Sequence, residues 1–455
     1  MAVARSTVLG LAVLGLGALA LVPVPAAAAA ASAGQPAPAI SPITTFSACT
    51  GQNAEVEQAV DPVRGHVYEE WMGCGDRIGF ATSTDDGLHF GRPVVLADSL
   101  GAWDPSVAVA PDGTVYAAFM NGTAHHSFPV VEVSRTYGRT FPQVRKLVPR
   151  QRDNWGDRDF IAVGPTGTVY LTWDYGPSAA DVTFLCSNGG SCSFATGDLN
   201  IVLQRSTDEG RRWSRMAHVS PGFPAGGADS APLLVEPDGT IYVEYQGYHM
   251  TSRTRFTMTT AHSYATASAD GGRTWSRPIR LGPERLSMNR TEWWIDGAIG
   301  TDAAGNLYVT WDTQVDHRDI GWLSYSTDHG AKWTRPLRVT PDTDNATHIV
   351  EVAGGAGGIA YVGWLADNSS HGYALYVRPF SVAHGWLSKP VQISRTYGNR
   401  TIWPGDTFGI SVLPAVQTGP QAGWPRLMVS WGSAVGGRAA RSQDRAAVVS
   451  WPTGT

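Results

Sequence analysis

The chain has 455 residues with 34 basic and 39 acidic side chains, which gives a net charge of −5. This near balance excludes the strongly basic surface that is typical of proteins binding nucleic acids or anionic membranes. Glycine, proline and tryptophan are abundant, with 52, 29 and 17 residues, and this favours short strands, turns and aromatic packing over helices.

The N-terminal segment has the pattern of a secretory signal peptide. Arg5 precedes an apolar run of about fifteen residues, and a Pro- and Ala-rich stretch follows, with a small-x-small pattern at Ala31-Ser32-Ala33. The apolar run is too short and too soon interrupted by proline for a membrane anchor. We therefore predict that residues 1–33 are a signal peptide. Residues 34–455 are predicted to form one secreted domain, monomeric and without membrane attachment.

A motif of the form Ser-x-Asp-x-Gly-x-x-Trp recurs along the chain. Its copies are STDDGLHF from Ser83, SRTYGRTF from Ser134, STDEGRRW from Ser206, SADGGRTW from Ser268, STDHGAKW from Ser326 and SVAHGWLS from Ser381. The second and sixth copies have Thr136 and Ala383 in place of the Asp. Ser and Asp side chains accept hydrogen bonds from turn backbone, and Gly permits a positive φ angle. The motif therefore predicts turns with a structural role for Asp85, Asp208, Asp270 and Asp328.

A second repeat lies between these motifs, a short alternating segment with a tyrosine at position 68, 116, 170, 242, 308 or 361. Alternation of β-branched and aromatic residues predicts strands. Each repeat then contains four strands: one of the SVAVA kind, the tyrosine strand, a strand ending in the Ser motif, and one of the RPIRL kind. A series of four-stranded meanders predicts an all-β fold, a β-propeller.

The number of blades depends on the two ends of the chain. Six repeats are complete, and the three strands GISVL, RLMVSW and RAAVVSW remain at the C-terminal end. The N-terminal segment SPITTFS can serve as their outer strand, which would close the ring and cover an exposed edge. We therefore predict seven blades, with six as the alternative.

All four cysteines lie in the exported part of the chain, where disulfides persist. Cys186 and Cys192 bracket a Gly/Ser-rich loop, and Cys49 and Cys74 remain. Four cysteines allow three pairings, of which we predict Cys49 with Cys74 and Cys186 with Cys192. Metal ligation is the alternative, but no CxxC spacing or His partner suits zinc.

The repeated motifs resemble the Asp-box, or BNR, repeats of the sialidase superfamily over about residues 50–400. The resemblance implies a propeller, and Asp-box propellers include hydrolases, lyases and binding domains. True sialidases clamp a substrate carboxylate with three arginines, the first in a Phe/Tyr-Arg-Ile-Pro motif, and use an Asp acid/base and a Tyr nucleophile. This sequence lacks that motif, since its nearest string, DRIGFATS from Asp76, begins a third strand. Sialidase catalytic domains also have six blades rather than seven.

Function is expected on the face opposite the Ser motifs, where the inner strands begin and the loops are long and varied. Acidic residues recur at those strand starts. They are Glu55, Asp104, Asp157, Asp159, Asp229, Glu292, Asp296 and Asp406. A close pair of carboxylates can supply acid/base catalysis, and a ring of them can hold a hard cation such as Ca²⁺. The alternative is that these acids cap backbone N–H groups of the channel.

Tryptophan lies beside acids in several of these loops, as an aromatic sugar platform requires. The loop LGPERLSMNRTEWWIDG, from Leu281, is the richest. We predict Asp159, Glu292 and Asp296 as catalytic residues and Arg158 and Arg290 as substrate clamps. The further predicted substrate-binding residues are Trp103, Trp155, Trp293, Tyr248, Asp104, Asp229 and Asp406.

The expected function is that of an exo-sialidase-like glycoside hydrolase that acts on extracellular glycans through a carboxylate pair. Two alternatives stay open. One is a non-catalytic propeller that binds a glycan or a protein. The other is a polysaccharide lyase, for which Tyr248 and His249 on one loop suit proton abstraction.

Overall fold

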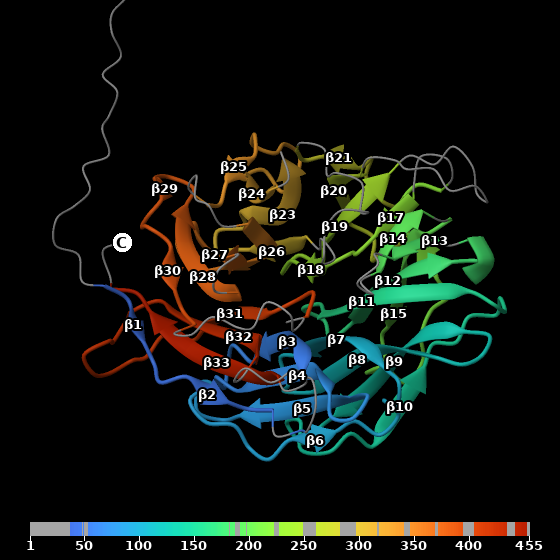
Figure 1. Cartoon of the computed structure of the whole chain (residues 1–455), viewed down its shortest axis with the longest axis horizontal. Helices are drawn as coiled ribbons and strands as arrows, with labels where there is room; N and C mark the ends of the chain where they lie inside the picture. The colour runs from blue at the N-terminus through green and yellow to red at the C-terminus, as the bar shows by residue number, and fades with distance from the viewer. Residues whose placement is uncertain are drawn as a thin grey trace, which may run out of the picture. The chain divides into compact units, whose positions relative to one another are not determined.

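The computed structural model describes residues 37–47, 49, 53–181, 183–186, 192–196, 198–222, 227–248, 261–282, 297–315, 318–340, 346–368, 372–394, 405–434 and 442–452. These residues form seven antiparallel sheets, each a four-stranded meander, and the sheets are the blades of a β-propeller (Figure 1). The described part of the chain contains no α-helix, only the 3-10 turn η1 (Ala179–Asp181). No helix within it is long and apolar enough to cross a membrane.

The first three blades follow one another along the chain, each from its inner to its outer strand. Blade 1 consists of β3 (Ala54–Val60), β4 (Val67–Gly73), β5 (Arg77–Ser83) and β6 (Val94–Val95). Blade 2 consists of β7 (Trp103–Val109), β8 (Val115–Gly122), β9 (Ser127–Ser134) and β10 (Gln143–Lys146). Blade 3 consists of β11 (Trp155–Val163), β12 (Val169–Gly176), β15 (Asn200–Ser206) and β16 (Ala217–His218), with the hairpin β13 (Thr183–Cys186) and β14 (Cys192–Thr196) inserted.

The next three blades repeat the same order. Blade 4 consists of β17 (Gly227–Asp229) and β18 (Leu233–Val235), which both pair with β19 (Ile241–Tyr248), then β20 (Ala261–Ser268) and β21 (Ile279–Arg280). Blade 5 consists of β22 (Ala298–Thr301), β23 (Leu307–Val315), β24 (Arg318–Ser326) and β25 (Leu337–Arg338). Blade 6 consists of β26 (Ala346–Gly354), β27 (Ile359–Asn368), β28 (Gly372–Ser381), β29 (Gly385–Trp386) and β30 (Val391–Gln392).

The seventh blade joins the two ends of the chain. It consists of β31 (Gly409–Leu413), β32 (Arg426–Ala434) and β33 (Ser442–Ser450), with β1 (Ala39–Ile40) and β2 (Thr44–Thr45) as its outer edge. In the pairing of β2 with β33, Thr44 lies opposite Ala446, and β1 and β2 lie beside β33 in Figure 1. The prediction of seven blades closed by an N-terminal strand is therefore confirmed.

The hydrophobic core lies between neighbouring blades. At the boundary of blades 1 and 2, the buried rings of Tyr68 and Phe80 form one cluster with Val115 and Phe119. Burial of a phenylalanine side chain contributes about 1.5–3 kcal/mol. Because alternate residues of each strand face opposite neighbours, every blade packs on both sides, and this fixes the inner strands around a central channel.

The Ser-x-Asp-x-Gly motifs form the turns between the third and fourth strands, as predicted. In the turn at Ser268, the hydroxyl Oγ donates to Asp270 Oδ1 at 2.9 Å and accepts from the Gly272 N–H at 2.9 Å. Asp270 Oδ1 also accepts from the Thr274 N–H at 2.9 Å. In the second motif, Thr136 Oγ1 takes the place of the carboxylate and accepts from the Thr140 N–H at 2.9 Å.

These turns also connect adjacent blades through the carbonyl of their fourth residue. That residue has a positive φ angle in five of them, and four of these make the connection: Tyr137 at 55°, Glu209 at 58°, Gly271 at 73° and His329 at 55°. A side chain of the preceding blade donates to each carbonyl. The donors, in the same order, are Thr82 Oγ1, Gln143 Nε2, Arg205 Nη1 and Tyr242 OH. The turns therefore hold neighbouring blades together as well as ending hairpins.

A disulfide joins Cys49 to Cys74, as predicted. It links the segment after β2 to the β4–β5 turn of blade 1. The second predicted pair lies at Cα-paired positions, since Cys186 is opposite Cys192 in the hairpin of β13 and β14, and that disulfide stays a prediction.

Candidate functional site

The inner strands surround a central cavity of about 220 Å³. Every blade contributes to its wall, with residues such as Glu57, Ser106, Phe160, Leu233, Ile299, Val352 and Ile410. Glu57 and Glu351 are the charged side chains on this wall.

The inner strands of blades 1, 2, 3 and 6 share a β-bulge near their start, at Glu55, Asp104, Arg158 and Ile349. Glu55, Asp104 and Arg158 have φ angles of 57°, 49° and 47°, and each lies where its inner strand shifts register. A bulge bends the strand and redirects a side chain, and bulges are frequent next to active sites. Non-glycine residues with positive φ are uncommon and mark strain, which clusters at functional sites. The same local distortion therefore aims side chains from blades 1, 2 and 3 at one place.

Glu55, Asp104, Arg158 and Asp406, which precedes β31 of blade 7, lie near the starts of inner strands and form what we call the channel-mouth cluster. Arg158 Nη2 donates to Asp406 Oδ2 at 2.5 Å, and its Nη1 lies 3.6 Å from Glu55 Oε1. The Arg158 backbone N–H donates to Asp104 Oδ2 at 2.8 Å. The guanidinium group of Arg158 is 5% exposed. The Arg158 guanidinium group therefore lies between carboxyl groups from blades 1 and 7, and the Arg158 backbone binds a carboxyl group from blade 2.

The electrostatics of the cluster favour the protonated form of Glu55. Its burial raises its pKa well above the usual value, and the charges of Asp104 and Asp406 raise it further, while Arg158 opposes them. A hydrogen bond between the Glu55 and Asp104 carboxyl groups raises the pKa of Glu55 as well. A carboxyl group whose pKa is raised by burial and by neighbouring acids is suited to general acid catalysis.

A second acidic group lies deeper, and we call it the buried acid pair, Glu70 on β4 and Asp159 on β11. Glu70 is 0% exposed and Asp159 is 2% exposed. None of their four carboxyl oxygens has a hydrogen-bond partner in the described part of the chain. Burial raises both pKa values well above the usual range, and the charge of Asp159 raises that of Glu70 further. Asp104 and Glu57 also raise the pKa of Asp159, which places the pair next to the channel-mouth cluster.

One of the predicted aromatic residues, Trp103, lies next to the cluster, directly before Asp104 in β7. The indole N–H of Trp103 donates to Asp157 Oδ1 at 2.6 Å, which fixes the ring at the start of β7. Trp103 and Trp155 are both half-buried, so each exposes part of its ring. A fixed, partly exposed indole is suited to packing against a sugar.

The structure places the predicted site residues in three groups. Asp104, Arg158 and Asp406 come together at the channel mouth with Trp103 nearby, whereas Asp159 lies in the buried acid pair. Asp229 and Tyr248 lie at the ends of β17 and β19, and Gly227 pairs with Tyr248. Outside the described residues lie Arg290, Glu292, Trp293 and Asp296.

Arg158 differs from the expected substrate clamp in its environment. A clamp needs an accessible guanidinium group, but Arg158 is buried and already ion-paired with Asp406. The positive charge of Arg158 is balanced by Asp406 rather than being available to a substrate.

Sequence reasoning missed Glu70, and it gave Glu55 no specific role. Glu70 belongs to the segment VYEEW, which was interpreted only as a strand. Two adjacent glutamates among Val67, Tyr68 and Trp71 nevertheless indicate buried carboxyl groups, because a strand buried on both faces leaves neither side chain in water. Glu69 is 0% exposed, like Glu70.

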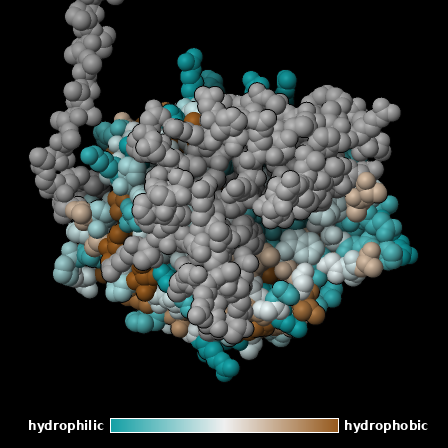
Figure 2. Space-filling view, viewed as in Figure 1, coloured by the Kyte–Doolittle hydropathy of each residue, from teal (hydrophilic) through white to brown (hydrophobic). Residues whose placement is uncertain are grey.

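Metal binding is not supported by the described part of the chain, where no group of three or more His, Cys, Asp or Glu side chains could hold an ion. The visible face of the molecule in Figure 2 shows hydrophobic and hydrophilic residues interspersed around the rim. The exposed large hydrophobic residues are likewise scattered, and they are Val63, Leu88, Val95, Leu100 and Val148.

Solved structures share this fold. A protein of unknown function from Dyadobacter fermentans is 14% identical and matches with a TM-score of 0.51, over 77% of this chain and 95% of its own. An ulvan lyase, a polysaccharide lyase, is 13% identical and matches with a TM-score of 0.52, over 88% of this chain and 94% of its own. No protein-family model matches the sequence, and no curated protein matches it significantly. At such low identity these similarities show the β-propeller fold alone.

Proposed function

We propose that this protein is a secreted, carbohydrate-acting propeller that hydrolyses glycosidic bonds at the channel mouth. The observation that carries the proposal is the Glu55–Asp104 pair, in which a buried carboxyl group with a raised pKa is hydrogen-bonded to a partly exposed one. Asp104, which is partly exposed, is the proton donor to the leaving oxygen, and the buried Glu55, hydrogen-bonded to it, supplies the proton to Asp104.

Hydrolysis needs a second carboxylate on the other side of the sugar. We assign this part to the loop that contains Glu292 and Asp296, on the sequence evidence given above. Arg290, Trp293 and Tyr248 complete the proposed substrate contacts, together with Trp103 and Trp155. The ulvan lyase shows that a polysaccharide-active protein uses the same fold, which supports a glycan as the class of substrate.

A binding propeller without catalysis is the second candidate. It is favoured by the ion pair of Arg158 with Asp406, because a neutralised arginine holds blades together without any substrate.

The test is product analysis by mass spectrometry after incubation with a panel of glycans that includes sialylated and uronic-acid-containing chains. We expect cleavage by the wild type, and a loss of about 10²-fold or more in Glu55→Gln, since general acid catalysis contributes at least this factor. Glu292→Gln, Asp296→Asn and Asp159→Asn test the predicted carboxylates one at a time. Glu209→Gln is the control, because it makes the same change in an exposed turn on the opposite face.

Three outcomes decide between the functions. Cleavage with an added water molecule that Glu55→Gln abolishes supports hydrolysis at the channel mouth. An unsaturated product identifies a lyase. Binding of a glycan without any product identifies a recognition propeller.

A further inference from the structure

A pocket of about 660 Å³ lies between the Ser motif turns of blades 1 and 2, and we call it the turn pocket. Its lining includes His66, Phe80, Thr82, Phe90, Arg92 and Arg139. It lies at the opposite ends of the strands from the channel mouth, because Glu55 begins β3 and His66 follows its end. The turn pocket is therefore separate from the site proposed above. A volume of this size is typical of small-molecule sites.

The turn pocket is open because the side chain that connects blades 1 and 2 at this boundary is small. Between blades 3 and 4, the long side chain of Arg205 reaches the carbonyl of Gly271 and occupies the corresponding space. Thr82 stands at the same position before its Ser motif, and its hydroxyl donates to the Tyr137 carbonyl at 3.1 Å. A threonine makes the same hydrogen bond with far less volume, so the space beside it stays open.

Arginine side chains without acidic partners line this pocket. Arg92 makes no ion pair or side-chain hydrogen bond within the described residues, and Arg139 uses only its Nε, which donates to the Thr136 carbonyl at 3.2 Å. Both residues are exposed. The pocket's single carboxylate, Asp85, is engaged by His89 Nδ1 at 2.7 Å. The pocket thus offers two guanidinium groups to an anion.

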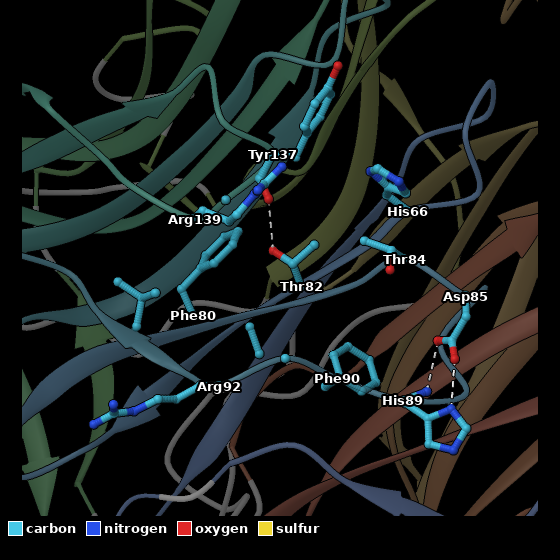
Figure 3. A pocket seen from close by; sticks show the side chains of 14 residues that line it. His66, Phe80, Thr82, Thr84, Asp85, His89, Phe90, Arg92, Tyr137 and Arg139 are labelled. Carbon is cyan, nitrogen blue, oxygen red and sulfur yellow. Dashed lines mark hydrogen bonds and ion pairs between the residues drawn. The ribbon is translucent and has the colours of Figure 1, made fainter.

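The remaining lining fits a sugar ring. In the view of Figure 3, Phe80 lies between Arg139 and Arg92, and Phe90 lies between Arg92 and the His89–Asp85 pair. Phe90 and Tyr137 are half-buried, so each presents part of a ring to the pocket. The hydroxyl of Thr84 and the imidazole of His66 can pair with sugar hydroxyls. Aromatic surface with a few polar groups is typical of sugar sites.

We propose that the turn pocket is an ancillary binding site for an acidic sugar, a uronic acid unit, whose carboxylate pairs with Arg92 and Arg139. Planar guanidinium groups recognise carboxylates through paired hydrogen bonds. The site binds glycan on the face away from the channel mouth. Its existence does not depend on catalysis there.

Isothermal titration calorimetry with a matched pair of disaccharides tests the proposal. Cellobiouronic acid and cellobiose differ by one carboxylate, so we expect the acid to bind at least tenfold more tightly. The double variant Arg92→Ala, Arg139→Ala should lose this preference. The matched control is Arg211→Ala, Arg215→Ala, which removes two exposed arginines from the turn of blade 3, and it should bind as the wild type does.

The variant Thr82→Arg locates the site. It reproduces the arrangement of Arg205 at the boundary of blades 3 and 4, fills the pocket, and should weaken binding of cellobiouronic acid at least tenfold while the melting temperature stays near that of the wild type. Equal affinity for the two disaccharides, undiminished binding by Thr82→Arg, or no binding of the acid to the wild type would each overturn the proposal.

Discussion

Arg158 of blade 3 and Asp406 of blade 7 form an ion pair at 2.5 Å, although 248 residues separate them in the sequence. Both side chains are 5% exposed. The pair spans the channel mouth instead of joining neighbours in the ring. Glu55 of blade 1 lies near the same guanidinium group, and Asp104 of blade 2 accepts a hydrogen bond from the Arg158 backbone N–H. The cluster therefore connects four of the seven blades.

Loss of the central cation should destabilise the protein strongly. We expect Arg158→Met to cost about 3–5 kcal/mol in the free energy of unfolding, since it leaves buried carboxylates without compensation. Urea denaturation measures the change. Arg212→Met is the control, because Arg212 also pairs with an aspartate, Asp208, but is 89% exposed, and it should have no measurable effect. Equal stability of the two variants would show that the cluster does not hold the blades.

Glu70 should make the stability of the protein depend on pH. Its pKa is raised in the folded state by burial and then by the charges of Asp159, Glu132 and Glu57. The unfolded chain ionises near the usual value of 4.5, so above that pH the folded state binds the extra proton and stability falls as pH rises.

The substitution Glu70→Gln removes this penalty. The free energy of unfolding of this variant should exceed that of the wild type only slightly at pH 4. Above the usual pKa of a glutamate, the difference should grow by about 1.4 kcal/mol per pH unit until the folded-state pKa of Glu70 is reached. Urea denaturation from pH 4 to pH 8 measures the difference. A difference that does not change with pH would mean that Glu70 is ionised in the folded protein.

The hydroxyl of Ser268 should stabilise its turn. Ser268→Ala deprives the Gly272 N–H of its acceptor and Asp270 of a donor, and we expect a loss of about 1–2 kcal/mol. Ser381→Ala is the comparison, because Ser381 accepts only a longer bond, 3.2 Å, from the Ala383 N–H. Thermal unfolding of both variants should rank Ser268→Ala as the less stable. The opposite ranking would contradict the structural role of the complete motif.

The disulfide between Cys49 and Cys74 should stabilise the closure of the ring. It spans 25 residues of sequence, and a loop of this length corresponds to about 3 kcal/mol in the chain-entropy account. We expect the variant Cys49→Ser, Cys74→Ser to melt at a lower temperature by the equivalent amount. For a test with a reducing agent, both proteins should also carry Cys186→Ser and Cys192→Ser, which remove the second predicted disulfide. In that background, reduction should lower the melting temperature of the protein that keeps Cys49 and Cys74 and leave that of the variant unchanged.

The fold could be predicted because the sequence motifs that indicate it recur along the chain. The Ser motif and the tyrosine strand each occur six times, so an uncertain copy such as the one at Ser134 is interpreted through its neighbours. Closure by β1 and β2 followed from counting strands. The four carbonyls that join the blades were not predicted, since their donors Thr82, Gln143, Arg205 and Tyr242 share no residue type and come from different strands.

The site could be predicted only in outline. Acids at the starts of inner strands indicated Asp104 and Asp406, but a sequence does not show that Arg158 and Asp406 meet across the ring. The burial of Asp159 was equally hidden, because a bulge between Asp157 and Phe160 interrupts the alternation that would otherwise assign each side chain to a face.

The closure of blade 7 has a consequence for how the chain is made. Thr44 is synthesised long before its partner in the sheet, Ala446. During translation the edge strands β1 and β2 must wait until β33 has been made before they can pair. The ring therefore closes only after blades 1 to 6 have been synthesised, and a nascent chain that stalls in blade 6 carries β1 and β2 without their partner.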